Sequence, residues 1–292
     1  MVTRHRLAGL LHFKEPDFSV LGTAIAEHGD YAVETLTLRI GDANTRGLLT
    51  RPTGSAGPLP AILYAHSHGG KYEIGAQELL DGREYLQEPL GPVLARAGYV
   101  TLAVDMPVFG VRSSTSEAAA AKALLWRGKS LIGQMVCEQA AALSYLAGRP
   151  DVDASRLGAF GMSMGCTLSY WLAALDNRIK AVAQLCCFAD QRTMIELGAH
   201  DGHGIYMVVP GLLEEADAGA IAALIAPRPQ LVCLGEADRL TPPQAFSRAW
   251  EELLPAYASA PANLQLISEP GVGHEETPRM RQAMLAFLRE HL

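Results

Sequence analysis

The sequence predicts an α/β fold with a mostly parallel central sheet and helices on both of its faces. Short apolar runs recur along the chain and are continuous, as expected for strands buried on both sides. They lie at 61–65, 99–104, 156–160, 181–187, 230–235 and 263–268. Helical stretches alternate with them, which is typical of parallel strands joined by crossover helices. These stretches lie at about 84–97, 117–147, 164–175, 244–254 and 278–290.

Two other regions have a different pattern. Residues 33–40, "VETLTLRI", alternate apolar and polar, and 47–51 follow after a turn, which predicts an N-terminal antiparallel hairpin. We expect residues 1–30 to be an N-terminal extension of a single domain that spans 1–292. The segment 188–222 is long and has a mixed composition without a clear period. A segment of that length inside a domain is usually functional, so we expect a small lid-like insertion there.

Composition narrows the class of protein. The 292 residues contain 24 Lys and Arg against 31 Asp and Glu, a formal net charge of −7, without a basic run, which argues against a nucleic-acid partner. The five cysteines show no C-x-x-C spacing, so reduced, buried thiols are expected. We expect a cytoplasmic protein without a membrane span, because no apolar run is long enough for one. Composition leaves homo-oligomerisation open.

The motif G-x-S-x-G occurs in "AFGMSMGCTL", residues 159–168, and is centred on Ser163. In a chain of this composition the motif arises by chance with a probability of roughly one in eight, so its position carries most of the information. It lies between a predicted strand and a predicted helix, where a sharp turn can expose a nucleophilic serine. The alternative is an ordinary turn serine.

A serine nucleophile needs a base and an orienting carboxylate. His274 lies in "EPGVGHEE", after the last predicted strand, and Asp238 lies just beyond the strand at 230–235. The order Ser163, Asp238, His274 is the one expected on an α/β sheet. The alternatives are a surface histidine and a turn-forming aspartate.

An oxyanion intermediate needs two donors. The predicted donors are the N–H of Met164 at the start of the helix and that of His68 in the loop "YAHSHGG" (64–70), with Gly69 as the alternative. We do not favour a metal site at the two histidines of this loop, because a third ligand of clear spacing is missing.

Substrate contacts are less constrained by the sequence. His203 and Tyr206 lie in the expected insertion, and Tyr72 follows the predicted oxyanion loop. We assign all three to substrate binding, although a surface position is an equally good interpretation of Tyr72.

Together these motifs resemble the α/β-hydrolase superfamily over about residues 30–292, and within it the branch of dienelactone hydrolases and acetyl-xylan-esterase-like proteins. The segments that carry the resemblance are "HSHGG", "DMPVFGVRSS", "RPDVDASRLGAFGMSMG", "LIAPRPQLVCLGEAD" and "GVGHE". The resemblance implies triad roles for Ser163, Asp238 and His274 and oxyanion roles for Met164 and His68. Dienelactone hydrolases proper have cysteine at the position of Ser163, which argues against that exact activity.

The predicted function is hydrolysis of a small carboxylic ester through an acyl-enzyme, without a metal or organic cofactor. One alternative is a short-peptide or amide hydrolase of the prolyl-oligopeptidase type, which the lack of a propeller-sized region makes less favoured. A second alternative is a catalytically inactive binding protein on the same fold, against which the complete triad argues. A third is a cofactor-free perhydrolase or haloperoxidase.

Overall fold

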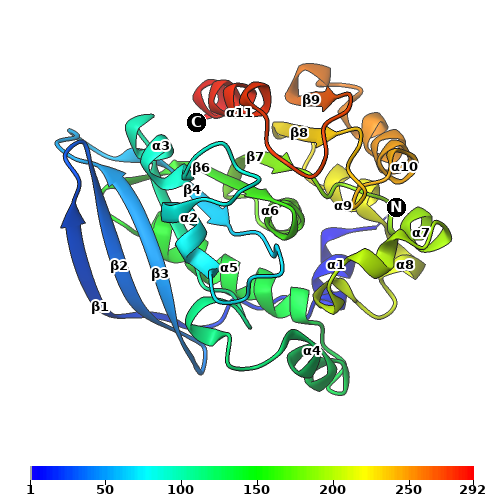
Figure 1. Ribbon diagram of the computed structural model, residues 1–292, viewed down its shortest axis with the longest axis horizontal. Helices are drawn as coiled ribbons and strands as arrows, with labels where there is room; N and C mark the ends of the chain where they lie inside the picture. The colour runs from blue at the N-terminus through cyan, green and yellow to red at the C-terminus, as the bar shows by residue number, and fades with distance from the viewer. Residues whose placement is uncertain (1) are drawn as a thin grey trace.

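One mixed sheet spans the computed structural model, which describes residues 2–292 (Figure 1). Its strands are β1 (Phe18–Glu27), β2 (Tyr31–Ile40), β3 (Ala43–Pro52), β4 (Leu59–Ala65), β5 (Val100–Val104), β6 (Val152–Met162), β7 (Ile179–Leu185), β8 (Gln230–Gly235) and β9 (Leu264–Glu269). They lie in the order β1-β2-β3-β5-β4-β6-β7-β8-β9. The pairs from β1 to β5 are antiparallel and all the later pairs are parallel, as the sequence predicts.

Most of the helices lie between these strands in the chain, whereas the first precedes β1 and the last follows β9. They are α1 (Arg4–Leu10), α2 (Glu78–Asp81), α3 (Leu90–Arg96), α4 (Glu117–Leu125), α5 (Leu131–Ala147), α6 (Met164–Leu175), α7 (Gln191–Glu196), α8 (Leu212–Glu215), α9 (Ala218–Ala223), α10 (Pro243–Leu253) and α11 (Pro278–His291). Short 3₁₀ turns are η1 (Gly75–Gln77), η2 (Gly110–Arg112), η3 (Ala199–Gly202), η4 (Ile205–Met207), η5 (Leu254–Tyr257) and η6 (Pro261–Asn263). Within residues 2–292, none of the helices combines the length and the apolar character needed to cross a membrane.

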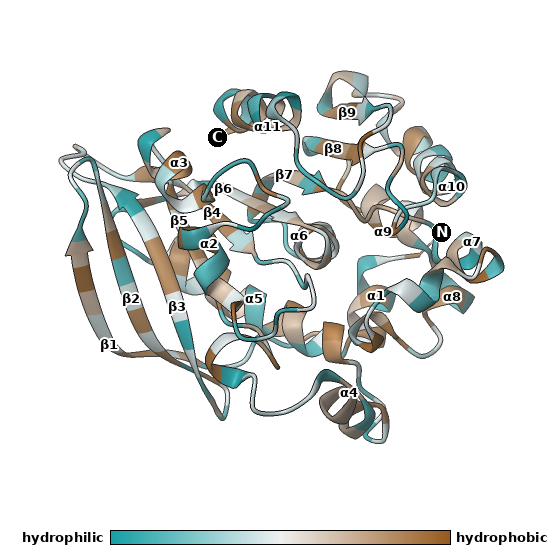
Figure 2. Cartoon of the chain, viewed as in Figure 1, coloured by the Kyte–Doolittle hydropathy of each residue, from teal (hydrophilic) through white to brown (hydrophobic). Residues whose placement is uncertain are grey.

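Two apolar layers cover the two faces of the sheet. Along β4, Leu63 packs with the layer that contains α5 and α6, while Tyr64 packs with the layer that contains α2, α3 and α11. This alternation follows from the pleat of a strand, which directs successive side chains to opposite faces. In Figure 2 the apolar residues lie along the strands, whereas the outer turns of α10 and α11 are largely hydrophilic.

The N-terminal region is larger than the predicted hairpin. β2 and β3 form that hairpin, but residues 1–30, expected as an extension, also contain α1 and the edge strand β1. The sequence "FSVLGTAIAE" of β1 is exposed from Ser19 onward. It has no buried face, so no apolar alternation marks it as a strand.

Two predicted helices differ from the structure. The helix expected at 84–97 begins only at Leu90, because Pro89 disfavours helical backbone in the residue before it. The helix expected at 117–147 is interrupted between α4 and α5, where Gly128 has a φ of +70°. A left-handed glycine ends a helix, so a change of direction there is favoured.

The expected insertion at 188–222 contains α7, η3, η4, α8 and part of α9. It follows β7 and forms the yellow-green group of short helices in Figure 1. The insertion therefore consists of ordered turns and helices rather than one long loop, and it lies where β7 ends.

Candidate active site

Ser163 stands between β6 and α6, as the sequence predicts. Its φ of +58° and ψ of −120° lie in a region that L side chains rarely adopt. Such backbone strain of about 1–3 kcal/mol persists when the surrounding structure holds it, and it is concentrated at active sites. The N–H of Ser163 donates to the Leu185 carbonyl at 2.9 Å, which anchors the turn to the end of β7.

The glycines on both sides of Ser163 are required by close packing. A Cβ on Gly165 would collide with the Ala65 carbonyl at the end of β4, and a Cβ on Gly161 would collide with the backbone of Gly165. The turn therefore brings the head of α6 against the loop that follows β4.

Asp238 and His274 form a hydrogen-bonded pair. The Nδ1 atom of His274 lies 2.7 Å from Asp238 Oδ2, and the other carboxylate oxygen accepts the N–H of Leu240 at 2.8 Å. The Asp238 side chain is fully buried, whereas that of His274 is 20% exposed. With Nδ1–H donating to the carboxylate, Nε2 of a neutral His274 keeps its lone pair and can accept a proton.

The environment of Asp238 keeps its carboxyl ionised. Burial on its own would raise the pKa, but the hydrogen bonds from His274 and from the Leu240 N–H outweigh it and hold the pKa of Asp238 below its ordinary value. A carboxylate that is charged at neutral pH can fix the tautomer of the imidazole and stabilise an imidazolium.

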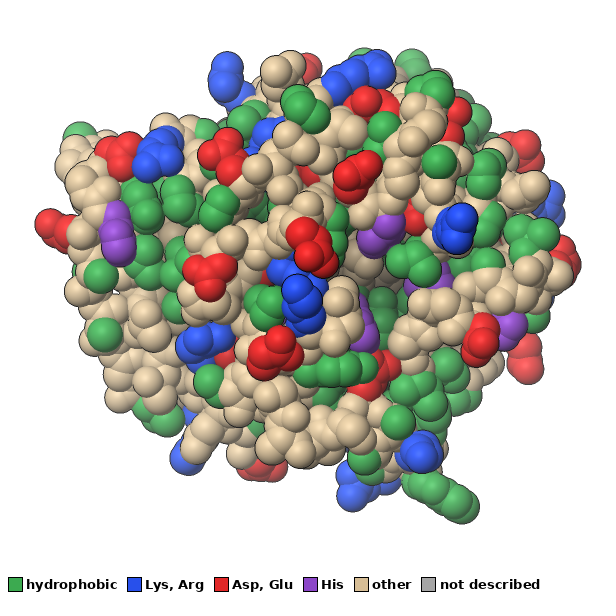
Figure 3. Space-filling model, in the orientation of Figure 1, with side chains coloured by type: hydrophobic (Ala, Val, Ile, Leu, Met, Phe, Trp, Pro, Cys, Tyr) green, Lys and Arg blue, Asp and Glu red, His purple; other side chains and the backbone are tan. Residues whose placement is uncertain are grey.

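Ser163, Asp238 and His274 follow β6, β8 and β9, so the parallel sheet brings all three to its carboxyl edge. Within residues 2–292 no hydrogen bond joins Ser163 Oγ to His274, and such contacts often form only when substrate is bound. Figure 3 shows a hollow near the middle of the face seen in Figure 1, with histidine side chains at its border.

Three backbone N–H groups near this turn have no acceptor. In the part of the chain that the structure describes, the N–H groups of Met164, His68 and Gly69 donate no hydrogen bond. Met164 is the first residue of α6, where N–H groups are free and the helix dipole is positive. These groups could stabilise an oxyanion, and the structure leaves both His68 and Gly69 available for the second position.

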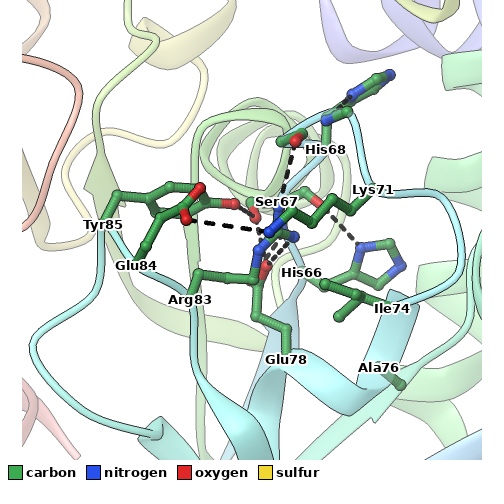
Figure 4. Close-up of polar contacts among 12 residues, drawn as sticks. His66, Ser67, His68, Lys71, Ile74, Ala76, Glu78, Arg83, Glu84 and Tyr85 are labelled. Carbon is green, nitrogen blue, oxygen red and sulfur yellow. Dashed lines mark hydrogen bonds and ion pairs between the residues drawn. The ribbon is translucent and has the colours of Figure 1, made fainter.

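A buried carboxylate supports the loop that contains His68. Glu78 accepts the N–H of Ser67 at 2.9 Å, the hydroxyl of the same serine, and the hydroxyl of Tyr64 at 2.6 Å. Figure 4 shows Arg83 beside this cluster, where its Nη1 donates to Glu78 at 3.2 Å, and Tyr85, whose hydroxyl contacts Ser67 Oγ. These hydrogen bonds tie the loop to β4 and to the segment that contains Arg83 and Tyr85.

The segment around Tyr85 also reaches the histidine loop. The ring of Tyr85 lies edge-on to His274, with centroids 6.4 Å apart, and its carbonyl accepts the N–H of Glu276 at 2.8 Å. No sequence motif marks Glu78, Arg83 or Tyr85, and only Tyr85 lies within the helix expected at 84–97. Their positions, just after an unusual "HSHGG" loop, were the only available signal.

Each of the three residues assigned to substrate binding contacts the loop of His68, the side chain of Glu117 or the loop of Asp238. The Tyr72 hydroxyl donates to Glu117 at 2.9 Å, and the ring of Tyr206 stacks on His68. His203 is hydrogen-bonded through Nε2 to the Leu240 carbonyl at 2.8 Å. The structure thus places Tyr72 and Tyr206 beside the loop of His68, and His203 against the loop of Asp238.

A cavity of about 360 Å³ lies within the insertion. Its lining includes His200 and His203 together with apolar side chains such as Ile205, Met207 and Leu212. None of Ser163, Asp238 and His274 lines it, but His203 in its lining is hydrogen-bonded to the Leu240 carbonyl in the loop of Asp238.

One group of side chains could in principle coordinate a metal. Ligand atoms of Cys186, Asp238 and His274 lie within 4.8 Å of one another. Burial raises the pKa of the Cys186 thiol well above its ordinary value, so the thiol stays protonated near neutral pH. A metal here would also have to replace the hydrogen bond between Asp238 and His274, so the geometry fits that pair better than a metal centre.

Comparison with known proteins agrees with this architecture. The model of the dienelactone hydrolase family matches residues 46–276. The protein named "Putative hydrolase YtaP" from Bacillus subtilis (strain 168) is 38% identical over 290 residues, which cover 98% of this chain and 97% of the relative.

Solved structures share the fold. A "putative acetyl xylan esterase" from Bacteroides fragilis NCTC 9343 superposes with a TM-score of 0.76 at 19% identity, covering 98% of this chain and 86% of the other. A glucuronoyl esterase from Solibacter usitatus superposes with a TM-score of 0.68 at 16% identity, covering 98% and 91%. These similarities show an α/β-hydrolase fold, and together with the family match they establish that the chain is a hydrolase that belongs to the dienelactone hydrolase family.

Proposed function

We propose that this hydrolase cleaves a small carboxylic ester with Ser163 as nucleophile, His274 as general base and Asp238 as the residue that orients the base. The observation that carries the proposal is the strained backbone of Ser163 at the head of α6, on the same sheet edge as the Asp238–His274 pair. A nucleophile, a base and an orienting carboxylate are the minimum set for acyl transfer without a cofactor.

The reaction begins when Nε2 of His274 takes the proton of the Ser163 hydroxyl as Oγ attacks the ester carbonyl. Asp238 holds Nδ1–H in place and stabilises the positive charge that develops on the imidazole. The negative charge on the tetrahedral oxygen is stabilised by the N–H of Met164 and by that of His68 or Gly69, which are free to donate.

His274 then gives its proton to the leaving alcohol, which departs and leaves an acyl group on Ser163. Water hydrolyses this acyl-enzyme, again with His274 as base. Serine in place of cysteine keeps the nucleophile neutral until the base acts, which matches a mechanism that depends on the Asp238–His274 pair.

Two observations support a small ester as the substrate. The structural neighbours named acetyl xylan esterase and glucuronoyl esterase support an ester as substrate. The insertion contains only short helices, of which α7 and α9 have six residues each, so it lacks a long apolar lid. We therefore propose that the substrates are esters with short acyl groups.

Covalent labelling tests the nucleophile. The protein is treated with a fluorophosphonate, and the adduct is located by peptide mass spectrometry. We expect the adduct on Ser163, and Ser163→Ala should lower kcat by ~10⁴–10⁶ without changing the circular-dichroism spectrum. An adduct on another residue of the active enzyme, or an active enzyme without any adduct, would contradict the mechanism.

A substrate panel tests the reaction. Aryl esters of increasing acyl length are assayed beside peptide amides and beside peracid formation with hydrogen peroxide. We expect acetyl and butyryl esters to have the highest kcat/KM. Faster turnover of octanoyl esters would contradict the short-acyl proposal, and faster cleavage of amides would favour a peptidase.

A further inference from the structure

A second buried carboxylate, Glu117, links the loop of His68 to the insertion. Glu117 is the first residue of α4 and is 5% exposed. Its Oε2 accepts Nε2–H of His68 at 2.5 Å and the Tyr72 hydroxyl at 2.9 Å, and its Oε1 accepts the N–H of Tyr206 at 2.9 Å. One side chain therefore receives donors from two separate segments, the loop that contains His68 and Tyr72 and the insertion that contains Tyr206.

The contact with the insertion leaves almost no free space. A Cβ on Gly204 would lie 2.5 Å from Glu117 Oε1 and 2.8 Å from the Tyr206 ring. The Tyr206 ring in turn stacks on the His68 imidazole, with centroids 5.5 Å apart and an interplanar angle of 27°. The insertion is thus packed directly against the residue whose N–H is a proposed oxyanion donor.

Both ring nitrogens of His68 are hydrogen-bonded. Its Nδ1 accepts the N–H of Gly70 at 3.1 Å while Nε2–H donates to Glu117. Both ring nitrogens are therefore occupied, and the ring serves to join the loop to Glu117 and Tyr206. Loss of the Glu117 carboxylate would release the His68 ring and the Tyr206 N–H at the same time.

We propose that Glu117 is a specificity-determining positioning residue, which fixes the separation between the oxyanion loop and the insertion and so limits the size of the acyl group. This inference rests on the proposed function of Ser163. An acyl carbonyl bound at the His68 N–H has its carbon chain within a few ångströms of that loop, so a wall held by the same residue restricts the chain. A hydrophobic site of fixed size discriminates acyl chains by steric exclusion.

The test compares Glu117→Gln with a matched control, Glu138→Gln. Glu138 is 4% exposed and binds Arg112, but it lies on α5 outside the candidate active site. Both variants remove a buried carboxylate charge. We expect Glu117→Gln to raise the ratio of octanoyl to acetyl kcat/KM by about tenfold or more, mainly because the long acyl chain is no longer excluded and octanoyl kcat/KM rises. Glu138→Gln should leave the ratio unchanged.

Glu78→Gln provides a contrast on the other side of the same loop. It disturbs Ser67 but not the insertion, so it should lower kcat for all acyl lengths by a similar factor. A shift in the ratio that is as large for Glu78→Gln as for Glu117→Gln would overturn the assignment of specificity to Glu117.

A second variant covers the case in which Glu117→Gln does not fold. Gly204 has a φ of −69°, which alanine also adopts, so Gly204→Ala disturbs the same junction by steric contact alone. It should shift the acyl ratio in the same direction. An unchanged ratio in the folded variants, in a protein whose Ser163 labels with fluorophosphonate, would overturn this inference and leave the proposed function intact. Failure of the wild type to label would instead contradict the proposed function.

Discussion

The Nδ1 atom of His274 lies 2.7 Å from the buried Oδ2 of Asp238, although 36 residues separate them in the chain. The bond fixes which imidazole nitrogen carries the proton. Asp238→Asn should therefore favour the wrong tautomer and lower kcat by ~10⁴ while changing KM little. Steady-state kinetics on an aryl acetate measures both constants.

Glu236→Gln is the control for this substitution. Glu236 lies two residues earlier and is exposed, and its carboxylate accepts the Ser268 hydroxyl at 2.6 Å, so removing its charge should change kcat by less than about threefold. If Asp238→Asn retains near-wild-type turnover while Glu236→Gln loses it, the acid of the triad is misassigned.

Two adjacent glycines should respond differently to alanine. Gly69 and Gly70 have φ of +51° and +70°, so alanine is strained at both. A Cβ on Gly69 would also collide with Arg83 and lie 2.7 Å from the Tyr85 hydroxyl, whereas a Cβ on Gly70 would meet nothing within 4 Å. We expect kcat to fall about 10²-fold for Gly69→Ala, because a small displacement of the loop misplaces the oxyanion donors.

For Gly70→Ala, kcat should fall much less, with a similar loss of thermal stability from backbone strain. Comparing kcat with the melting temperature separates the two effects. Equal losses of kcat in the two variants would show that strain, and not the contact with Arg83, is responsible.

The five cysteines should be unreactive in the folded protein. Cys137, Cys166, Cys186, Cys187 and Cys233 are all free and buried. Burial raises the pKa of the Cys166 and Cys186 thiols well above the ordinary value, which reduces the reactive thiolate. Titration with Ellman's reagent should label thiols slowly in native protein and all five after denaturation without reductant. A shortfall after denaturation would reveal a disulfide.

Glu117 should contribute stability that depends on pH. Burial alone would raise its pKa, but the hydrogen bonds from His68, the Tyr206 N–H and Tyr72 hold the pKa of Glu117 below its ordinary value. A lowered pKa in the folded state stabilises the fold above the pKa of the unfolded chain, and this contribution is lost as pH falls through the folded value.

The difference in unfolding free energy between wild type and Glu117→Gln should therefore be largest at neutral pH and should shrink as the pH falls below the ordinary pKa of a glutamate. Urea unfolding at several pH values measures it. Glu251→Gln, which replaces an exposed carboxylate of α10, should show little difference throughout. A gap for Glu117→Gln that widens as the pH falls would contradict the expected direction.

Features with a local physical cause were predictable. Continuous apolar runs predicted the parallel strands because burial on both faces requires them, and G-x-S-x-G predicted the turn at Ser163 because side chains at Gly161 and Gly165 would collide with backbone. β1 was missed because an exposed edge strand has no buried face. α3 starts later than the expected residue 84, because Pro89 disfavours helical backbone in the residue before it.

The sequence by itself determined which polar residues follow the predicted strands and in which order they occur. That order identified Ser163, Asp238 and His274 as the candidates. Only the tertiary structure decided what holds the loop of His68. Glu117 lies 49 residues from His68 and 89 from Tyr206, and neither spacing has a local signature. A buried carboxylate is stable only where folding brings enough donors to it, and that depends on long-range packing, which no local pattern encodes.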